Sequence, residues 1–342
     1  METVMLGRSG LQVCKNGFGA LPIQRISKKE AVYLLQKAFD NGFDYFDTAR
    51  WYTDSEEKLG EAFARVRDKI VISTKTGAED AEQFWKDLDT SLTLLKTDYI
   101  DIYQFHNPAF CPRPGDGTGL YEAMEKAVRQ GKIRHIGITN HRLSVAKEAV
   151  VSGLYETLQF PFSYLASEEE VKLVEACRKE NMGFIAMKAL SGGLITDAAA
   201  AYAYLAQFDN VAPIWGIQRE SELDAFISCQ KNPPTMTEEI LQKIEQDKAQ
   251  LSGDFCRGCG YCMPCPAGIE INNCARMSLL LRRAPQKGYL SAEWQEKMKK
   301  IENCIHCNQC RKKCPYGLDT PKLLAKNYED YISFAEREDV QK

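Results

Sequence analysis

Residues 99–140 hold two apolar strand-like stretches on either side of an amphipathic helix. The stretches read YIDIYQFH (99–106) and GKIRHIGITN (131–140), and GTGLYEAMEKAVRQ (117–130) lies between them. They predict strands at 99–105 and 133–138 and a helix over 117–130 that stops at Gly131. A strand, a helix and a second strand in this order predict a parallel βαβ unit.

The same alternation runs through the first two thirds of the chain. Eight strand and helix pairs in about 215 residues predict a closed (β/α)8 TIM barrel, an α/β fold. A doubly wound open sheet is the competing interpretation, but no Gly-x-Gly-x-x-Gly follows the first strand. The other predicted strands are 16–20, 43–46, 70–74, 155–160, 183–187 and 211–215. The other predicted helices are 28–41, 55–64, 82–96, 142–150, 167–180, 195–208 and 219–230.

Composition excludes several classes of function. The 342 residues carry a net charge of −3, which is atypical of a nucleic-acid-binding protein. No apolar run approaches the roughly 18 residues that span a bilayer, so we predict no membrane segment. The N-terminus lacks the basic and apolar regions of a signal peptide. A chain of this length holds about two folded units.

Eight of the thirteen cysteines form two compact runs near the C-terminus. They are Cys256, Cys259, Cys262 and Cys265, then Cys304, Cys307, Cys310 and Cys314. The second run has the bacterial ferredoxin spacing, and paired runs predict two [4Fe–4S] clusters. In such pairs the fourth cysteine ligates the other cluster, so Cys314 joins the first three cysteines of run one and Cys265 joins those of run two.

Alternatives to this ligand set remain at the sequence level. The first run is one residue short before Cys265, so Cys274 is a substitute candidate. Two zinc sites are a second alternative, because four thiolates also suit Zn²⁺. Thiolates bound to iron require a reducing compartment, which predicts a cytoplasmic protein.

Polar side chains occur where the predicted barrel strands end. Asp47 and Tyr52 follow the second strand, Lys75 ends the third, and His106 ends the fourth. Active sites of such barrels lie at the C-terminal ends of the strands. The pattern therefore predicts that a carboxylate, a phenol, a lysine and a histidine converge on one mouth.

At these residues the chain resembles the aldo-keto reductase superfamily. Matching segments include Gly17–Ala20, Ser55-Glu56, 91–101 and 131–140, so the resemblance spans residues 3–230. With the cysteine runs it resembles a bacterial and archaeal subgroup that carries a mainly helical, two-cluster ferredoxin-like domain. The resulting domains are a barrel (1–235), a connecting helix (236–252), the dicluster domain (253–320) and a C-terminal helix (321–342).

The resemblance implies a reaction and roles for the four residues. It implies reversible reduction of a small carbonyl substrate to an alcohol, with hydride from NADH or NADPH. Tyr52 would protonate the carbonyl oxygen, and His106 would orient it. Lys75 would make the phenol more acidic, and Asp47 would hold Lys75.

The resemblance also implies where the dinucleotide binds. Thr139, Asn140 and Gln159 would contact the carboxamide, and Phe162 would stack on the nicotinamide. The segment 186–194 would cradle the pyrophosphate, with Lys188, Leu190 and Gly192 as contacts. Gly216 and Arg219 would lie near the adenosine. Arg219 stands between Glu220 and Glu222, and few basic residues for a 2′-phosphate favour NADH.

The clusters have three interpretations. They could be structural, or they could relay electrons from an external electron carrier. Alternatively, the barrel could bind a ligand without carbonyl reduction, which would make the protein an iron–sulfur electron carrier. An intact set of four catalytic residues disfavours the last interpretation.

Overall fold

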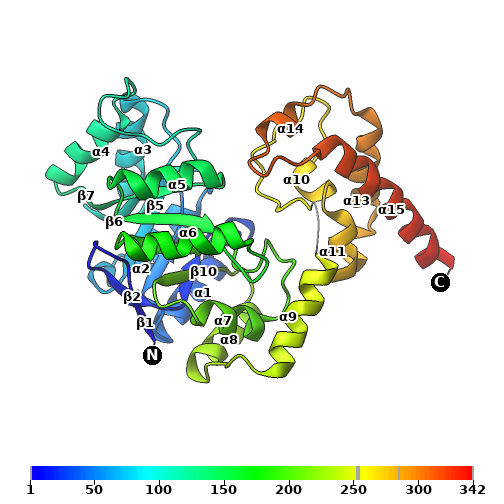
Figure 1. Cartoon of the computed structure of the whole chain (residues 1–342), viewed down its shortest axis with the longest axis horizontal. Coiled ribbons are helices and arrows are strands. Elements are labelled where there is room, and N and C mark those ends of the chain that lie inside the picture. Colours follow the sequence, from blue (N-terminus) through cyan, green and yellow to red (C-terminus); the bar gives the residue numbers. More distant parts are fainter. Residues whose placement is uncertain (1, 252–254, 284–285, 341–342) are drawn as a thin grey trace. The chain divides into compact units, whose positions relative to one another are not determined.

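The computed structural model describes residues 2–251, 255–283 and 286–340 (Figure 1). Clustering of contacts divides the chain into two compact units. The first consists of Met1–Ala189 and Asp197–Ile244, and the second of Leu190–Thr196 and Glu245–Lys342. The boundary between the two units, after Ile244, falls inside the connecting helix that the sequence predicts at 236–252. It also assigns the short segment Leu190–Thr196 to the second unit, which the sequence pattern does not reveal.

Eight parallel strands of the first unit close into a barrel (Figure 1). Their order around the barrel is β10, β3, β4, β5, β6, β7, β8 and β9. Closure confirms the predicted (β/α)8 fold and excludes an open doubly wound sheet. The strands are β3 (Gly17–Gly19), β4 (Tyr45–Asp47), β5 (Val71–Thr76), β6 (Ile100–His106), β7 (Ile133–Thr139), β8 (Thr157–Pro161), β9 (Gly183–Met187) and β10 (Val211–Gly216).

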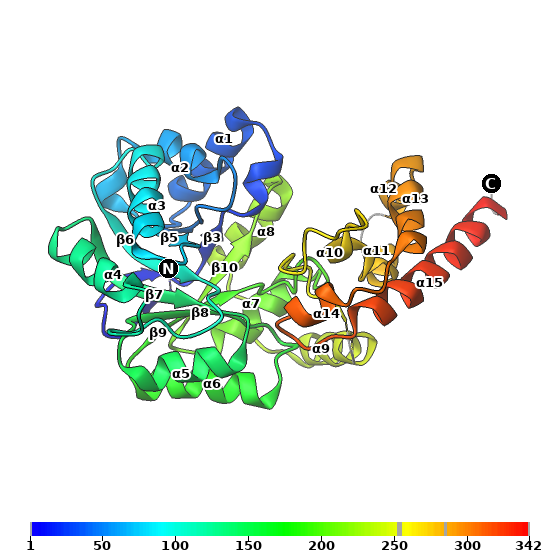
Figure 2. The same ribbon diagram turned by 90° about the horizontal axis from the view of Figure 1, so that it is seen from above.

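Eight helices alternate with these strands, and Figure 2 shows them around the barrel. Capping boxes at Ser27 with Glu30 and at Ser167 with Glu170 confirm two predicted helix starts. The helices are α1 (Lys28–Asp40), α2 (Ser55–Phe63), α3 (Ala81–Leu94), α4 (Leu120–Arg129), α5 (Leu143–Ser152), α6 (Glu168–Lys179), α7 (Ala198–Ala206) and α8 (Glu220–Lys231). Short 3-10 turns lie at Pro22–Arg25 and Arg67–Lys69.

Two of these helices begin three residues later than predicted. Gly119 precedes α4 with φ of +67°, a left-handed conformation that a right-handed helix cannot include. The side chain of Asp197 caps α7 by accepting a hydrogen bond from the Ala200 amide at 2.9 Å. Local capping chemistry therefore sets both starts more sharply than the apolar period does.

An N-terminal hairpin packs its apolar side chains with residues of the barrel interior. The hairpin strands β1 (Thr3–Met5) and β2 (Gln12–Cys14) pair antiparallel. One apolar cluster joins Val4, Leu6 and Val13 of the hairpin region to inward residues of the strands, namely Tyr45, Ile102, Ile185, Ala212 and Ile214. Most of these barrel residues lie at the start or in the middle of their strands, and Met187 at the end of β9 also belongs to the cluster, so apolar side chains fill the barrel from its N-terminal end to its middle. Polar inward residues lie at the other end.

The second unit contains short helices around its own apolar core. Buried members of this core include Ile271, Met277, Leu281, Met298 and Tyr331. The second half of helix α9 (Glu238–Gln250) begins this part of the unit. Then follow α10 (Ile271–Cys274), α11 (Met277–Arg283), α12 (Gln286–Tyr289), α13 (Ala292–Lys299), a 3-10 turn (Lys300–Asn303), α14 (Gln309–Lys313) and α15 (Thr320–Val340). No helix among the described residues is long and apolar enough to cross a membrane.

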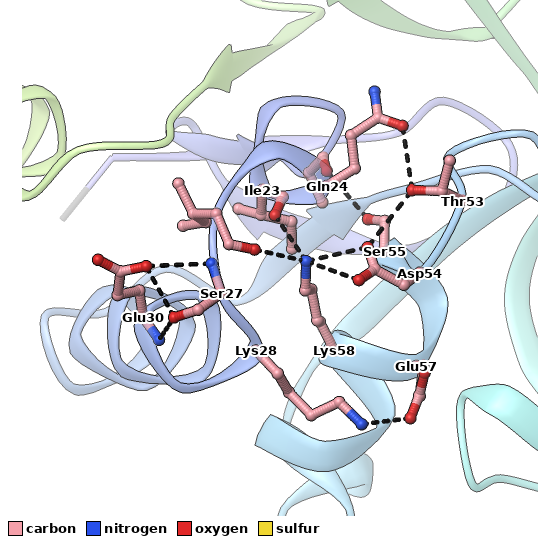
Figure 3. Close-up of polar contacts among 12 residues, drawn as sticks. Ile23, Gln24, Ser27, Lys28, Glu30, Thr53, Asp54, Ser55, Glu57 and Lys58 are labelled. Atoms are coloured by element: carbon pink, nitrogen blue, oxygen red, sulfur yellow. Dashed lines mark hydrogen bonds and ion pairs between the residues drawn. The ribbon is translucent and has the colours of Figure 1, made fainter.

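A buried lysine connects the loop after β3 to α2 (Figure 3). Lys58 is 1% exposed, and its Nζ donates to the carbonyl oxygens of Ile23 at 3.0 Å and Ile26 at 2.8 Å. It also donates to Oδ1 of Asp54 at 2.9 Å. The three donors of the ammonium group are therefore used, and the start of α2 is held against residues 20–27.

Replacing this lysine tests that connection. We expect Lys58→Met to lower the free energy of unfolding by about 1–3 kcal/mol, because two buried carbonyl oxygens lose their donor. The matched control is Lys28→Met, since Lys28 is exposed and pairs only with Glu57 at the surface. Urea denaturation followed by circular dichroism measures both. Equal loss of stability in the two variants would contradict the assigned role of Lys58.

Candidate active site and cysteine-rich unit

A buried ion pair between two neighbouring strands forms the base of the candidate site. Nζ of Lys75 on β5 donates to both carboxylate oxygens of Asp47 on β4, at 2.8 and 2.7 Å, and to the Thr48 carbonyl oxygen at 2.6 Å. Ser73 Oγ donates to Asp47 Oδ1 at 2.7 Å. Burial lowers the pKa of Lys75, and the Asp47 carboxylate opposes that shift.

The phenol and the imidazole lie beside this pair. Tyr52 is half-buried in the turn that follows β4, and Lys75 Nζ lies 5.3 Å from its ring centroid. The ring of His106, at the end of β6, meets the Tyr52 ring edge-on with 5.8 Å between centroids. The structure thus brings all four predicted catalytic residues together at the C-terminal ends of neighbouring strands.

His106 is held as a neutral imidazole. Burial lowers the pKa of His106 to about 3, and the positive charge of Lys75 adds to the shift. Its Nδ1 atom is buried and has no hydrogen-bond partner among the described residues. A buried polar atom of this kind normally has a partner in the working protein. Trp51 covers the ring at a centroid distance of 4.8 Å, although its own side chain is 55% exposed.

A second buried carboxylate fixes the turn that carries Tyr52. Glu56 is 1% exposed and forms an ion pair with Arg50, two residues before Tyr52. Its Oε1 accepts hydrogen bonds from Thr74 Oγ1 at 2.6 Å and Ser91 Oγ at 2.7 Å. Sequence reasoning used Glu56 only as part of a matching segment. An acidic residue on the buried face of an amphipathic helix was the signal that could have revealed this role.

Gln159 joins the catalytic group through its side-chain amide. Its Nε2 donates to Asp47 Oδ2 at 3.3 Å, and its Oε1 accepts from Gln104 Nε2 at 2.8 Å. Gln104 is fully buried on β6 and was not a predicted site residue. Its inward position follows from period 2, since it lies two residues before His106 on the same strand.

Thr139 and Asn140 lie together at the end of β7. Thr139 is buried, and its Oγ1 lies 3.8 Å from Met187 Sδ. Asn140 Nδ2 donates to the Pro108 carbonyl oxygen at 2.8 Å, and its Oδ1 accepts from the Arg142 amide at 2.8 Å. The amide of Asn140 therefore braces two loops at the mouth.

The structure does not bring Phe162 to the mouth. Its side chain is 2% exposed and packs edge-on against Phe184 at 5.6 Å and Phe208 at 5.1 Å. Gln159 points into the barrel. Because successive side chains of a strand point to opposite faces, residues 160 and 162 face outward toward the helices. That parity argues against the predicted stacking role of Phe162.

The segment after β9 contains the predicted pyrophosphate contacts. Lys188 and Leu190 are half-buried, whereas Gly192 is exposed. Positive φ angles occur at Lys188 (+53°) and Gly192 (+68°), which turn the chain sharply after the strand. The segment is thus an irregular turn with open backbone at Gly192.

Residues after β10 leave little free positive charge. Gly216 ends the strand and is exposed. Arg219 is bound to Glu222, with Nε at 2.9 Å and Nη2 at 2.5 Å from Oε1. Glu220 is itself paired with Lys37 at 2.7 Å. Both glutamates beside Arg219 therefore have a cationic partner within the chain.

Three other cysteines lie near Cys256 in the second unit. Burial raises the pKa of the Cys256 thiol, and negative charge on Cys259 and Cys314 raises it further. Burial raises the pKa of Cys262 to about 12, again with contributions from Cys256 and Cys259. Since such effects fall with distance, these four sulfurs lie close together, although Cys314 belongs to the other run.

The remaining run shares one cavity with Cys265. The cavity is lined by Cys262, Cys265, Cys304, Cys307 and Cys310, with Pro266, Ile271, Ile305 and Leu324 among its other walls. Among the described residues, no three His, Cys, Asp or Glu side chains are grouped closely enough to hold a single metal ion. A [4Fe–4S] cluster puts each of its four thiolates on a different iron and so requires wider spacing.

Comparison with known proteins decides the family. Residues 15–212, more than half of the chain, match the Aldo/keto reductase family. The chain belongs to the aldo/keto reductase family. Residues 255–319 match a 4Fe-4S dicluster domain, so this reductase carries a C-terminal iron–sulfur domain.

Individual relatives of this reductase cover the barrel. An uncharacterized oxidoreductase of Bacillus subtilis (strain 168) is 31% identical over 226 residues, which is 57% of this chain and 68% of the relative. The L-galactose dehydrogenase of Arabidopsis thaliana is 29% identical over 216 residues, 58% and 68% of the two chains. Among solved structures, an aldo-keto reductase from Bacillus halodurans has a TM-score of 0.63 at 22% identity and covers 72% of this chain and 96% of its own.

The cysteines of this aldo/keto reductase fit iron–sulfur clusters. Two groups of four thiols, each assembled from both runs, are the donor set that two [4Fe–4S] clusters require. Cys274 does not belong to either group. It is fully buried in the apolar core, and its Sγ lies 3.9 Å from the Lys297 carbonyl oxygen. Burial raises the pKa of Cys274 to about 12, which keeps it a neutral thiol.

Two single replacements separate the candidate fourth ligands. We expect Cys265→Ser to lose about half of the bound iron and sulfide, because one cluster loses a thiolate. Cys274→Ala is the matched control and should keep the full iron content. Anaerobic purification followed by iron analysis and visible absorption measures both. Loss of iron in Cys274→Ala with retention in Cys265→Ser would reverse the assignment.

Proposed function

We propose that the protein is a nicotinamide-dependent oxidoreductase that reversibly reduces an aldehyde or ketone, with Tyr52 as the general acid. The observation that carries this proposal is the buried pair of Lys75 and Asp47 directly beneath Tyr52, with neutral His106 at its edge. Membership of the aldo/keto reductase family supports the same reaction class.

Lys75 prepares the Tyr52 hydroxyl to give up its proton. A free phenol has a pKa of about 10, which makes it a poor acid at neutral pH. Lys75 Nζ lies 5.3 Å from the centre of the Tyr52 ring. At separations of about 4–5 Å, a positive charge stabilises a negative one by about 3–4 kcal/mol at an effective dielectric of about 20. Asp47 keeps Lys75 charged in spite of its burial, so the phenolate left after proton transfer is stabilised.

His106 positions the carbonyl oxygen of the substrate. Its pKa of about 3 means that the imidazole carries no charge at neutral pH, so it does not compete with Tyr52 as proton donor. A ring N–H of the neutral imidazole can donate a hydrogen bond to a carbonyl oxygen. Together, Tyr52 and His106 would contact the same oxygen from two sides.

The dinucleotide would lie across the mouth of the barrel. When bound, the nicotinamide supplies or accepts the hydride. Thr139, Asn140 and Gln159 are the candidate contacts for its carboxamide, and Gln159 is already linked to Asp47 at 3.3 Å. The segment that contains Lys188, Leu190 and Gly192 offers open backbone for the pyrophosphate, since Gly192 has no side chain to block close approach.

We propose NADH rather than NADPH as the preferred cofactor. Arg219 is the basic residue that follows β10, and its guanidinium is bound to Glu222. A 2′-phosphate at this place would have to compete with that carboxylate and would face its negative charge. A solved aldo-keto reductase from Klebsiella pneumoniae, 22% identical with a TM-score of 0.62, is in complex with NADPH, so the fold itself accepts the phosphate.

The cysteine-rich domain would add one-electron chemistry to this reductase. We propose that it holds two [4Fe–4S] clusters, one on Cys256, Cys259, Cys262 and Cys314, the other on Cys304, Cys307, Cys310 and Cys265. When bound, the clusters can accept or give single electrons, and an external electron carrier is the partner class that this chemistry requires. Hydride transfer in the barrel requires no metal, so the carbonyl reaction stands without them.

Replacing the proposed acid tests the mechanism. We expect Tyr52→Phe to lower kcat for carbonyl reduction by about 10²–10⁴-fold, the range for loss of a general acid. Tyr33→Phe is the matched control, because Tyr33 is an exposed phenol on α1 that donates to Glu220. Steady-state kinetics with an aromatic aldehyde would measure both. Unchanged turnover in Tyr52→Phe would refute the assigned acid.

The cofactor preference has a test of its own. We expect a higher kcat/KM with NADH than with NADPH, and Glu222→Gln should shift the ratio toward NADPH because it frees Arg219. Glu175→Gln is the control, since Glu175 makes the same kind of pair with Arg178 on α6. Both ratios come from steady-state kinetics on one carbonyl substrate. A strong NADPH preference of the unaltered protein would contradict the proposal.

A further inference from the structure

The proposed pyrophosphate segment is held by residues of the cysteine-rich unit. The segment Leu190–Thr196 follows β9 in the chain, yet it clusters with Glu245–Lys342 as one compact unit. Arg276, in the turn between α10 and α11, is 5% exposed. Its Nη2 donates to the Gly192 carbonyl oxygen at 2.5 Å. A charged, buried donor therefore fixes the backbone of this segment from within the second unit.

The guanidinium of Arg276 fits between two glycines. A Cβ atom on Gly192 would lie 2.8 Å from Arg276 Nη1, and a Cβ on Gly258 would overlap the same nitrogen. Both glycines have positive φ, +68° and +64°, so their backbones curve around the side chain. A side chain at either position would require the end of the arginine side chain to move.

Arg276 is itself carried on a fixed piece of backbone. Asn327 of α15 is 6% exposed, and its side-chain amide binds the backbone on both sides of Arg276. Its Nδ2 donates to the Ala275 carbonyl oxygen at 3.2 Å, and its Oδ1 accepts from the Ser278 amide at 2.8 Å. On the other side, the Gly258 amide lies 3.4 Å from Cys256 Sγ. Contacts thus run without a break from a proposed cluster ligand through Arg276 to Gly192.

We propose that Arg276 is a positioning residue for the dinucleotide: it holds the segment Leu190–Thr196 in the conformation that receives the pyrophosphate. The inference rests on the proposed function, because it takes that segment as the phosphate site. Gly192 and Gly193 are exposed, and glycines lose more conformational freedom on ordering than other residues do. Ordering the segment before the cofactor arrives removes that cost from binding. Cofactor affinity then depends on the folded cysteine-rich unit.

Arginine suits this role for a physical reason. Its guanidinium stays charged at all working pH values and presents several N–H groups in one plane. It can therefore bind a carbonyl oxygen at Gly192 and still pack against Gly258. A glutamine keeps a hydrogen-bond donor, but its side chain is shorter and it loses the charge and most of the donors.

Direct binding measurements on the cluster-loaded protein test the proposal. We expect Arg276→Gln to raise the Kd for NADH about tenfold or more, the effect of losing a hydrogen bond to a charged donor. Turnover at saturating NADH and the visible absorption of the clusters should stay close to those of the unaltered protein. The Kd comes from anaerobic titration of nicotinamide fluorescence. Arg282→Gln is the matched control, because Arg282 is exposed on α11 and pairs with Asp330 at 2.5 Å.

A second pair of variants leaves the cysteine-rich sequence untouched. Gly192→Ala places a methyl group against Arg276, whereas Gly193→Ala, also at positive φ, meets no described heavy atom within 4 Å. Both strain the backbone, so the role of Arg276 requires a greater loss of NADH affinity in Gly192→Ala than in Gly193→Ala. This pair decides the matter if Arg276→Gln does not assemble its clusters.

The outcomes separate this inference from the proposed function. If the unaltered protein binds neither NADH nor NADPH, both fail. If it binds NADH and loaded Arg276→Gln binds equally well, only the role of Arg276 is overturned. Equal affinities of Gly192→Ala and Gly193→Ala would overturn it as well.

Discussion

The buried ion pair of Asp47 and Lys75 is the constraint on which the site depends. Two charges inside a barrel are costly unless each is fully hydrogen-bonded, and removal of one partner leaves the other uncompensated. The chain meets that requirement with Ser73 inside β5, Gln159 inside β8 and Thr48 directly after β4. The need to satisfy this pair makes one end of the barrel polar and fixes the relative height of β4, β5 and β8.

Burial and neighbouring charges affect Lys75 and His106, the two basic side chains of the site, in different ways. Asp47, which binds Lys75 through both oxygens, opposes the loss of its positive charge on burial, whereas burial lowers the pKa of His106 to about 3 with no carboxylate partner for it among the described residues. In the proposed mechanism the two side chains therefore act differently on one substrate oxygen. The turn that carries Tyr52 owes its position to two further buried charges, Glu56 and Lys58, which connect it to α3 and to the loop after β3.

The second unit is a small domain with only a modest apolar core of its own. Its two groups of cysteines draw on both runs, so cluster binding would join segments about fifty residues apart in the chain. Arg276 extends this organisation to the segment after β9, because its guanidinium lies between Gly258 and Gly192. The contact lies within the second unit and holds the segment that we propose as the pyrophosphate site.

The amino-acid sequence was enough to predict the repeating units, the barrel and the positions of the four candidate catalytic residues at strand ends. Apolar period and capping signals are local, and all C-terminal strand ends of a closed barrel meet at one mouth. It did not reveal the partners of those residues, because hydrogen bonds such as Gln104 to Gln159 join strands 55 positions apart. The stacking role of Phe162 stays a prediction, and its packing against Phe184 and Phe208, which follows from strand parity, argues against that role. Only the tertiary structure showed that Leu190–Thr196 packs with the cysteine-rich unit, since the contact with Arg276 spans 84 residues and leaves no periodic signal.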